Sequence, residues 1–284
     1  MKNFDEISRS LEALPTIPIV VSRVLRVVED SASSANDLVD IIQNDQAICS
    51  KVLRVANSAY YGLRQQVTTI GHAVVLLGFE TVRNLCLGVG VFRSFLPYAQ
   101  RQVLDIERFW EHTIASGVCA RMLWEEQGWP GADEVFLAGL IHDIGRLAFL
   151  AAEPKGYTEL IQKARKDAAP MVEVEREEMG GTHAELGALL CERWDFGPGL
   201  VEPVHWHHDP GESGEEFARR AAGVALGNCL SHRRRIGWAV DALPPDIPQA
   251  ALDRLELTSE QADALADRLE NRRTEIESFT EALM

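Results

Sequence analysis

The sequence predicts an all-α protein, and two observations lead to that prediction. Apolar residues recur at positions i, i+3, i+4 and i+7 in almost every long segment, a spacing that gathers them on one face of a helix. Alternating apolar and polar residues, which are typical of strands, are scarce and short. With 284 residues, of which 46% are hydrophobic, the chain can bury a sizeable core in one large domain or two smaller ones.

Three helices are expected near the N-terminus. The first covers about residues 18–29, and its apolar face consists of Ile19, Val20, Val24, Leu25 and Val28. A second helix starts near Ala35, where aliphatic residues again recur with helical spacing. Asp45 begins a third, which we expect to end near Asn57 and Gly62 because these residues tolerate turn geometry.

The next segment, residues 69–95, is rich in small and aliphatic residues (GHAVVLLGF and LCLGVGVF). Its apolar run is too continuous for an amphipathic surface helix, so we expect buried helices at the centre of the fold. Pro97 marks the expected junction with a second helical set, which begins near Asp105. Helices of that set are expected around residues 110–124, 133–152, 157–168, 183–194, 198–208 and 215–234.

The C-terminal part is set off by three prolines between residues 244 and 248, which interrupt the helical pattern. Thr258 and Gln261 then form a capping pair, and a narrow stripe of leucine and alanine follows. We expect one exposed or docking helix over about residues 255–280, and such a helix could pair with a second copy of the chain. A terminal helix docked on its own chain is the plainer alternative.

Charge and composition narrow the classes of partner. The formal net charge of −15 argues against general nucleic-acid binding, since affinity for phosphates comes mostly from clustered lysine and arginine. We interpret the basic run at 233–235 as a solvated helix end. No apolar run approaches the roughly 18 residues of a membrane span, and MKNFDEISRS lacks a signal-peptide pattern. We therefore expect a cytoplasmic protein without membrane contact.

The cysteines carry no sign of a disulfide or zinc framework. They are five in number, widely separated and never in a CxxC pair. We expect small core residues in a reducing compartment, namely Cys49, Cys86, Cys119, Cys191 and Cys229.

The segment GLIHDIGRLAFL, residues 139–150, places a histidine and an aspartate side by side in an apolar run. Further histidines stand out in FWEHTIASG, GTHAELG and HWHHDP. Imidazole nitrogens and a carboxylate together suit Zn, Mn, Fe or Co, and a carboxylate can bridge two ions. The candidate metal ligands are therefore His112, His142, Asp143, His183, His207 and His208.

Asp143 lies at the border of the predicted buried face, where an unpaired carboxylate is costly. Neighbouring residues on a helix point about 100° apart, so the dyad can address one metal only from an end-on helix or at a bend. Gly139 and Gly145 flank the dyad and would let another helix approach closely. The partner of Asp143 stays open here: a metal, Arg146, Arg193 or a protonated histidine would each serve.

Three N-terminal motifs, together with the order of the histidines, resemble one known family. The motifs LPTIP (14–18), NDQAICSKVLRVANSAYYG (44–62) and IGHAVVLLGFETVRNLCL (70–87) are similar to those of the HDOD family, the HD-related output domain of bacterial signalling proteins. The resemblance runs from about residue 11 to 209, and more weakly to about 235. It implies an N-terminal helical bundle (11–98) packed on an HD-like helical bundle (99–240). Beyond the resemblance, we expect a C-terminal helical extension (241–284).

The resemblance extends to the HD-GYP phosphohydrolases, in which HDIG also occurs, and it implies that the six candidate residues match metal-binding positions. Two positions depart from the ligand pattern of these enzymes. Asn228 stands where an aspartate closes the ligand set, and a neutral amide lowers affinity for a divalent ion. Arg108 stands one turn before His112, where some of these enzymes carry a glutamate, and puts a cation near the site. The Gly-Tyr-Pro segment is missing, while Arg146 replaces a lysine and could still meet a phosphate.

Three functions follow from this resemblance. The first, which we favour, is a bacterial signalling module that binds a partner protein or small ligand, without robust catalysis. Its pocket would keep one or two Fe, Mn or Zn ions, or none. The second is a metal-dependent phosphohydrolase acting on a nucleotide or cyclic dinucleotide, with Asp143 and Arg146 as catalytic residues. The third is a redox or gas sensor with a diiron centre in the same pocket.

Overall fold

The computed structural model describes residues 2–29, 34–99, 104–237 and 243–284. Helices, turns and loops make up this described part, which contains no strand, so the predicted all-α fold is confirmed. The N-terminal elements are α1 (Phe4–Arg9), a 3-10 turn (Leu11–Ala13), α2 (Ile19–Glu29), α3 (Ala35–Gln43), α4 (Gln46–Ala56), α5 (Ile70–Leu77) and α6 (Phe79–Ala99).

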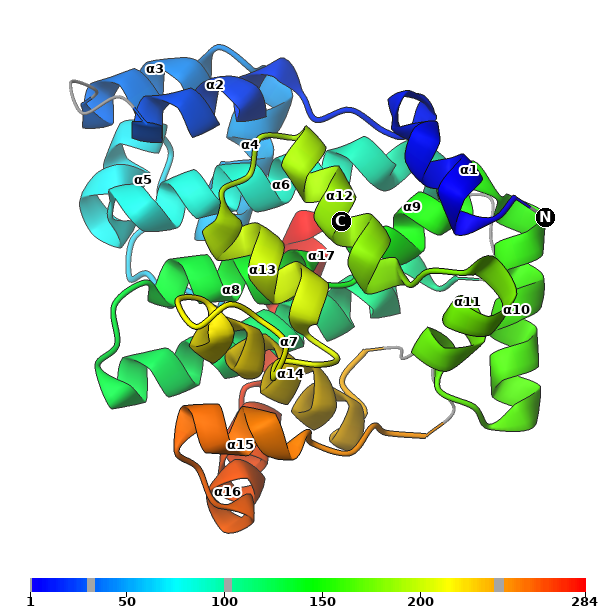
Figure 1. Cartoon of the computed structure of the whole chain (residues 1–284). Helices are drawn as coiled ribbons and strands as arrows, with labels where there is room; N and C mark the ends of the chain where they lie inside the picture. Colours follow the sequence, from blue (N-terminus) through cyan, green and yellow to red (C-terminus); the bar gives the residue numbers. More distant parts are fainter. Residues whose placement is uncertain (1, 30–33, 100–103, 238–242) are drawn as a thin grey trace.

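The second bundle follows, and three of its helices lie at the centre of the molecule. In Figure 1, α2 to α5 gather at the upper left, α7, α8 and α14 lie at the centre, and α10 and α11 lie at the right. The bounds of the second bundle are α7 (Ile106–Gln127), α8 (Ala132–Ile141), α9 (Ile144–Ala152), α10 (Pro154–Asp167), α11 (Met171–Met179), α12 (His183–Arg193), α13 (Pro198–Trp206) and α14 (Ala218–Arg233). The C-terminal helices are α15 (Gln249–Leu255), α16 (Ser259–Glu270) and α17 (Arg273–Leu283).

Polar side chains in the N-terminal bundle cap helices and fix loops. The Asp45 carboxylate accepts the backbone N–H groups of Ala47 and Ile48, and so caps the start of α4 as predicted. After α4, the Asn57 side chain donates to the Val67 carbonyl and accepts from the Val67 N–H. These two bonds hold the loop between α4 and α5 in place.

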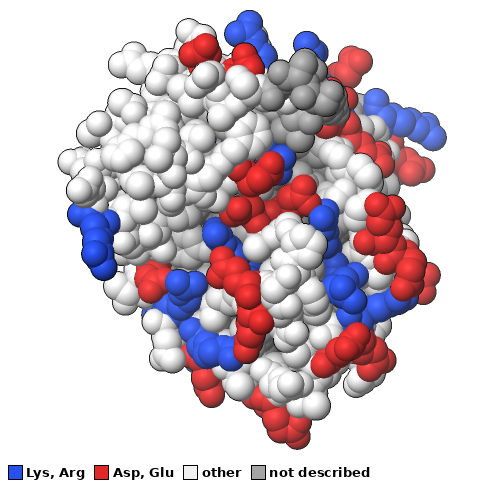
Figure 2. All heavy atoms as spheres, turned by 90° about the vertical axis from the view of Figure 1, so that its left-hand side faces the viewer, with Lys and Arg blue, Asp and Glu red and all other residues white. Residues whose placement is uncertain are grey.

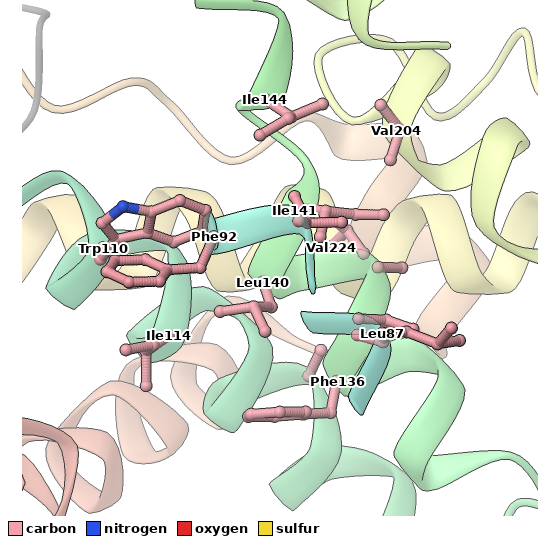
Figure 3. Packing of buried hydrophobic residues seen from close by; sticks show 14 of the residues in the cluster. Leu87, Phe92, Trp110, Ile114, Phe136, Leu140, Ile141, Ile144, Val204 and Val224 are labelled. Carbon is pink, nitrogen blue, oxygen red and sulfur yellow. The ribbon is translucent and has the colours of Figure 1, made fainter. Parts of the chain in front are cut away.

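One hydrophobic core joins the two bundles (Figure 3). Phe92 of α6 meets Trp110 of α7 edge-on, with ring centroids 5.3 Å apart. Tyr60, from the turn after α4, stacks on Phe136 of α8 at 6.0 Å. Burial of one such side chain stabilises the fold by about 1.5–3 kcal/mol. The bundles therefore stabilise each other, and the predicted boundary between them at residues 98 and 99 stays a prediction.

Glycines allow the central helices to approach closely. A Cβ on Gly139 of α8 would lie 2.5 Å from the Cα of Gly117 in α7. A Cβ on Gly145 of α9 would collide with the carbonyl of His183 in α12. Real Cβ atoms do not come so near, so only glycine fits at either position. The prediction that these glycines let other helices approach is confirmed.

Several predictions about individual helices are wrong. The expected helix over 133–152 is two helices, because the chain bends at His142 and Asp143. The expected last helix is also two, α16 and α17, and α11 was not predicted at all. Pro97 lies inside α6, where the last turn accommodates its ring, rather than at a junction. Helix α5 was expected at the centre of the fold, but it lies at the surface. One of its faces is buried against neighbouring helices, whereas Val75 on the opposite face is 80% exposed.

The segment Ala132–Ala152 is long and apolar enough, by length and composition, to cross a membrane, with a mean hydropathy of 1.6 over the test window. The expectation that no apolar run approaches such a length is therefore wrong. However, 89% of that window is buried inside the protein, as in the core helix of a globular fold. Burial in the core accounts for its apolar character.

The C-terminal helices dock on the rest of the chain. Thr258 and Gln261 form the predicted capping box at the start of α16. Phe279 of α17 is buried and lies 5.5 Å from the Tyr60 ring, measured between centroids. The docked terminal helix is thus the arrangement that the structure shows. Figure 2 shows charged residues of both signs interspersed over the lower part of one face and mainly uncharged residues at its upper left.

Candidate metal centre

The predicted dyad lies where two helices meet. His142 follows the last residue of α8, and Asp143 is the N-cap of α9. On a straight helix the two side chains would point about 100° apart, and the bend allows both to reach one place. Histidines from α7, from the first turn of α12 and from the end of α13 come to the same place. The structure thus brings all six predicted residues together: His112, His142, Asp143, His183, His207 and His208.

Asp143 is the centre of this cluster. Its Oδ1 lies 3.1 Å from Nε2 of His183. The same oxygen lies 3.6 Å from Nε2 of His142 and 3.7 Å from Nε2 of His207. The other oxygen, Oδ2, lies 4.0 Å from Nε2 of His112. Asp143 is only 3% exposed, so the ring nitrogens meet its carboxylate away from bulk water.

Two of the rings have their Nδ1 atoms bound to backbone carbonyls. Nδ1 of His142 lies 2.7 Å from the Gly139 oxygen, and Nδ1 of His207 lies 2.7 Å from the Val204 oxygen. A carbonyl can only accept, so Nδ1 carries the proton in both rings. A neutral ring then has its lone pair on Nε2, the atom that faces Asp143. Within the described residues, neither Nε2 has a hydrogen-bond partner.

The ring of His112 has the same arrangement. Its Nδ1 lies 3.1 Å from the Ser231 hydroxyl, which donates to the Asn228 carbonyl at 2.9 Å. When the Ser231 hydroxyl donates to that carbonyl, Nδ1 of His112 donates to Ser231 and Nε2 keeps its lone pair. Among the residues that the structure describes, this Nε2 also has no hydrogen-bond partner. Three imidazole lone pairs therefore face one carboxylate with no proton to share. A cation between them would stabilise this arrangement, which is that of metal-binding histidines.

The fourth ring, His183, is held by a carboxylate that was not predicted from the sequence. Oε2 of Glu175 lies 2.6 Å from Nδ1 of His183 and accepts the His183 backbone N–H at 2.8 Å. The Tyr157 hydroxyl donates to the other oxygen of Glu175, and both residues are fully buried. A carboxylate behind a metal-binding histidine fixes the ring and raises its basicity.

A signal for Glu175 was present in the sequence. It lies four residues after Met171 and four before Met179, on the apolar face of α11, and both methionines are buried. A glutamate on the apolar face of a helix needs a buried partner. Because α11 itself was not predicted, that face could not be recognised.

The donor atoms form two groups around Asp143. One contains His112, His142 and Asp143, and its donor atoms all lie within 4.8 Å of one another. The other contains His183, His207 and His208 within the same limit. Nitrogen and oxygen donors of this kind suit Fe, Mn and Zn. Both groups are compatible with a metal ion, and the unpartnered Nε2 atoms show that the residues fit one.

Burial keeps most of the rings neutral. It is the largest cause that lowers the pKa of His112, His207 and His208 well below the usual value for histidine. His183 differs: burial and Arg146 lower its pKa, but Glu175 and Asp143 outweigh them and the net pKa is raised. Neutral imidazole is the form that binds metal.

Arg146 is the protein's own cation in this cluster. Its Nε lies 3.0 Å from Oδ1 of Asp143, and the residue is 2% exposed. Burial would raise the pKa of Asp143, but Arg146 and the histidines lower it well below the usual range. Arg146, one of the four partners expected for the Asp143 carboxylate, is therefore in contact with it. It offsets negative charge that would otherwise attract a second ion.

The two departures from the expected ligand pattern have different outcomes. Asn228 of α14 is 3% exposed, and its side-chain oxygen has no hydrogen-bond partner in the described part of the chain. Its carbonyl bonds Ser231, which holds His112, so this residue lies beside the cluster. The expectation that Arg108 puts a cation near the site is wrong. Its side chain is 63% exposed and lies 3.7 Å from the Asp105 carboxylate.

One further histidine lies against the cluster. The ring of His232, on α14, is 4.7 Å from that of His112 between centroids, and His232 is buried. His232 adjoins the basic run at 233–235, for which the sequence predicts a solvated helix end, so no place at the site was expected for it. His232 lies in the last turn of α14, where this helix packs against α7.

Comparison with known proteins gives a consistent result. The family model of the HDOD domain matches residues 14–210. An HDOD domain protein of unknown function from Geobacter sulfurreducens is 21% identical, with a TM-score of 0.82 over 98% of this chain and 97% of that one. A Shewanella amazonensis protein assigned as a phosphohydrolase is 25% identical, with a TM-score of 0.78 over 98% of both chains.

Other relatives are longer than this chain. A protein from Marinobacter aquaeolei, assigned to signal transduction, is 23% identical with a TM-score of 0.78, over 95% of this chain and 60% of that one. An uncharacterized protein of Treponema pallidum is 27% identical over 263 residues, which are 90% of this chain. This chain spans 48%, about half, of the length of that relative.

Proposed function

Because this chain belongs to the HDOD domain family, we propose that it is a signalling module that keeps a metal pocket and acts by binding a partner protein or a small ligand. Family membership and the likeness to HDOD proteins support a signalling module. The metal pocket and the lack of robust catalysis are the further steps, and they are argued from the cluster around Asp143.

The observation that carries the metal pocket is the set of unpartnered Nε2 atoms. In His112, His142 and His207 these atoms face a buried carboxylate and form no hydrogen bond with any residue that the structure describes. One divalent ion would be held by His112, His142 and Asp143, and His183, His207 and His208 would be available to a second. Such an ion would supply the positive charge that the lone pairs face, and it would tie the helices of the second bundle together.

Two features argue against robust catalysis. The first is access: Asp143 is 3% exposed and His142 and His183 are fully buried, so a phosphodiester cannot reach the carboxylate without rearrangement. The second is charge, because Asn228 is a neutral amide and Arg146 already neutralises part of Asp143. A structural or sensory ion needs neither open access nor a complete anionic ligand set.

Elemental analysis tests this proposal directly. The protein is purified without chelator and without affinity nickel, next to its His142→Ala variant. We expect about one transition-metal ion per chain, lost in the variant, and no measurable turnover of bis(p-nitrophenyl) phosphate by either protein. Absence of metal from both proteins would contradict the proposed metal pocket.

A metal-dependent phosphohydrolase is the second candidate function. The observation that favours it is that the two oxygens of Asp143 face both donor groups: Oδ2 faces His112, and Oδ1 faces His183 and His207. A carboxylate placed in this way can bridge two ions. In this case Asp143 would hold the ions, and Arg146 would meet the phosphate. Phosphodiester turnover that disappears in Asp143→Asn would establish this function instead of the first.

A further inference from the structure

Two grooves run beside the last helix, α17, and share one lining residue, Glu281. One groove lies between α17 and α4 with the loop that follows α4. The other lies between α17 and the first turns of α7. The Ser278 hydroxyl of α17 accepts the Ala59 backbone N–H at 3.0 Å, which fixes α17 beside the end of α4. The two grooves therefore belong to one surface, and their lining includes no residue of the candidate metal centre.

Basic side chains gather on the α4 side of this surface, which we call the basic side. Arg54 lines the groove and is exposed, and Lys51 lies one turn earlier on the same helix. Burial lowers the pKa of Lys51, and the nearby charges of Arg54 and Arg93 lower it further. Of these three cations, Arg93 pairs with Asp45. Lys51 and Arg54 form no ion pair with any residue that the structure describes, so their charges repel each other without compensation.

Acidic side chains gather along α7 and the outer face of α17, which we call the acidic side. Four glutamates line the groove there, namely Glu107, Glu111, Glu277 and Glu281. Three of them are exposed, and Glu111 is half-buried. Burial raises the pKa of Glu111, and the carboxylate of Glu277 raises it further because like charges repel. None of the four forms an ion pair within the described residues, since the arginine of this groove, Arg108, pairs with Asp105.

The two sides of this surface thus carry charges of opposite sign, and each side repels itself. A matching partner has to present acidic groups to the basic side and basic groups to the acidic side. A second copy of this chain presents both, because a two-fold axis brings each patch of one copy onto the other patch of its partner. The formal net charge of −15 makes two copies repel each other over most of their surfaces. Contact between copies is therefore favoured where a basic patch meets an acidic one.

We propose that this surface is a two-fold interface between two copies of the chain, in which the basic side of each copy meets the acidic side of the other. The interface then contains two equivalent sets of ion pairs between lysine or arginine and glutamate. Exposed ion pairs are individually weak and are screened by salt, so the dimer forms reversibly and dissociates as the salt concentration rises. The inference rests on the charges of this surface and does not require a metal.

Sedimentation velocity on the full chain tests this interface. At about 0.1 M salt, where the Debye length is about 10 Å, we expect a reversible dimer. At about 1 M salt the Debye length falls to about 3 Å, and the dissociation constant should rise roughly tenfold. Treatment with EDTA should leave the dissociation constant unchanged, so the result is independent of the candidate metal centre.

Charge reversal identifies the surface. The double variant Lys51→Glu with Arg54→Glu makes both sides acidic. The triple variant Glu107→Lys, Glu277→Lys and Glu281→Lys changes only exposed side chains and makes both sides basic. Each variant alone should show a dissociation constant raised roughly 100-fold, because sides of the same sign then face each other. An equal mixture of the two variants should form a heterodimer, since every contact is again between opposite charges.

A matched control carries the same change in net charge as the double variant but at another place. Lys155→Glu with Lys166→Glu alters two exposed lysines of α10, outside both grooves, and should dimerise like the parent chain. Circular dichroism checks that each variant is folded, and Arg54→Gln, at an exposed position, replaces the double variant if that chain does not fold. The proposal is overturned if the parent chain is monomeric at low salt up to about 0.1 mM. It is also overturned if the control loses the dimer, if a variant of either side dimerises like the parent chain, or if the mixture forms no heterodimer.

Discussion

The two bundles bury different kinds of side chain. Among the described residues before 100, the buried polar side chains are Ser58, Thr81, Arg83 and Asn84. The second bundle buries an aspartate, a glutamate, an arginine and five histidines, most of them in one cluster. Burial of ionisable groups lowers stability unless they are paired. Burial of these ionisable groups therefore lowers the stability of the second bundle unless they are paired, and an all-α fold does not require it. Their concentration in one cluster indicates a functional site.

The largest expected effect comes from removing the central carboxylate. Asp143→Ala takes away the group that faces Arg146 and the histidine rings, and should lower the free energy of unfolding by about 3–5 kcal/mol. Urea denaturation followed by circular dichroism measures this. Arg93→Ala breaks a partly exposed ion pair with Asp45 in the N-terminal bundle and should cost less than about 1 kcal/mol. Equal losses would contradict the comparison.

A smaller effect is expected behind His183. Glu175→Gln keeps the shape of the side chain but removes the charge that holds the ring, and should weaken metal affinity about 10- to 100-fold. Competition with a chromophoric chelator measures the affinity. The matched control is Glu178→Gln on the same helix, whose carboxylate pairs with Lys163 at the surface. If both variants bind metal like the parent chain, Glu175 has only a structural role.

Periodicity was sufficient to predict the all-α fold and most helix positions. It could not predict the break at His142 and Asp143, because the apolar pattern continues through both neighbouring helices. Local hydrophobicity also placed α5 at the centre, although Val75 faces solvent. Apolar content indicates a tendency to be buried, whereas tertiary packing decides which face is covered.

Residue type and order were sufficient to predict the ligands of the candidate site. They did not predict the hydrogen bonds that orient these ligands. The six ligand candidates meet as expected, but the tautomers of three rings depend on carbonyls such as those of Gly139 and Val204. The contact between Glu175 and His183 likewise joins two helices, α11 and α12. Spacing within α11 can mark Glu175 as a buried carboxylate, but it does not identify the ring that this carboxylate holds.

A change at Asn228 is expected to have an effect of intermediate size on metal binding. Asn228→Asp adds negative charge beside His112, where the amide oxygen has no partner. We expect the metal to be retained about tenfold more tightly, because an anionic oxygen binds a divalent ion better than an amide does. Metal loss during dialysis against EDTA measures retention. Unchanged retention would mean that this side chain does not face the ion.

The smallest effect tests whether the two bundles open independently. Burial raises the pKa of Cys119 to about 12 and also raises the pKa values of Cys86 and Cys191. Thiolates are therefore rare at pH 8, and alkylation reports opening of the helix that carries each cysteine. Cys119 and Cys191 share helices with His112 and His183, whereas Cys86 lies on α6.

Removal of metal should loosen only the bundle that the ion ties together. EDTA is expected to speed iodoacetamide labelling of Cys119 and Cys191 roughly three- to tenfold, and to leave Cys86 unchanged, as followed by peptide mass spectrometry. Equal acceleration at all three cysteines would mean that the shared core makes both bundles open as one unit. The polar cluster would then stabilise the whole fold rather than the half of the chain that contains it.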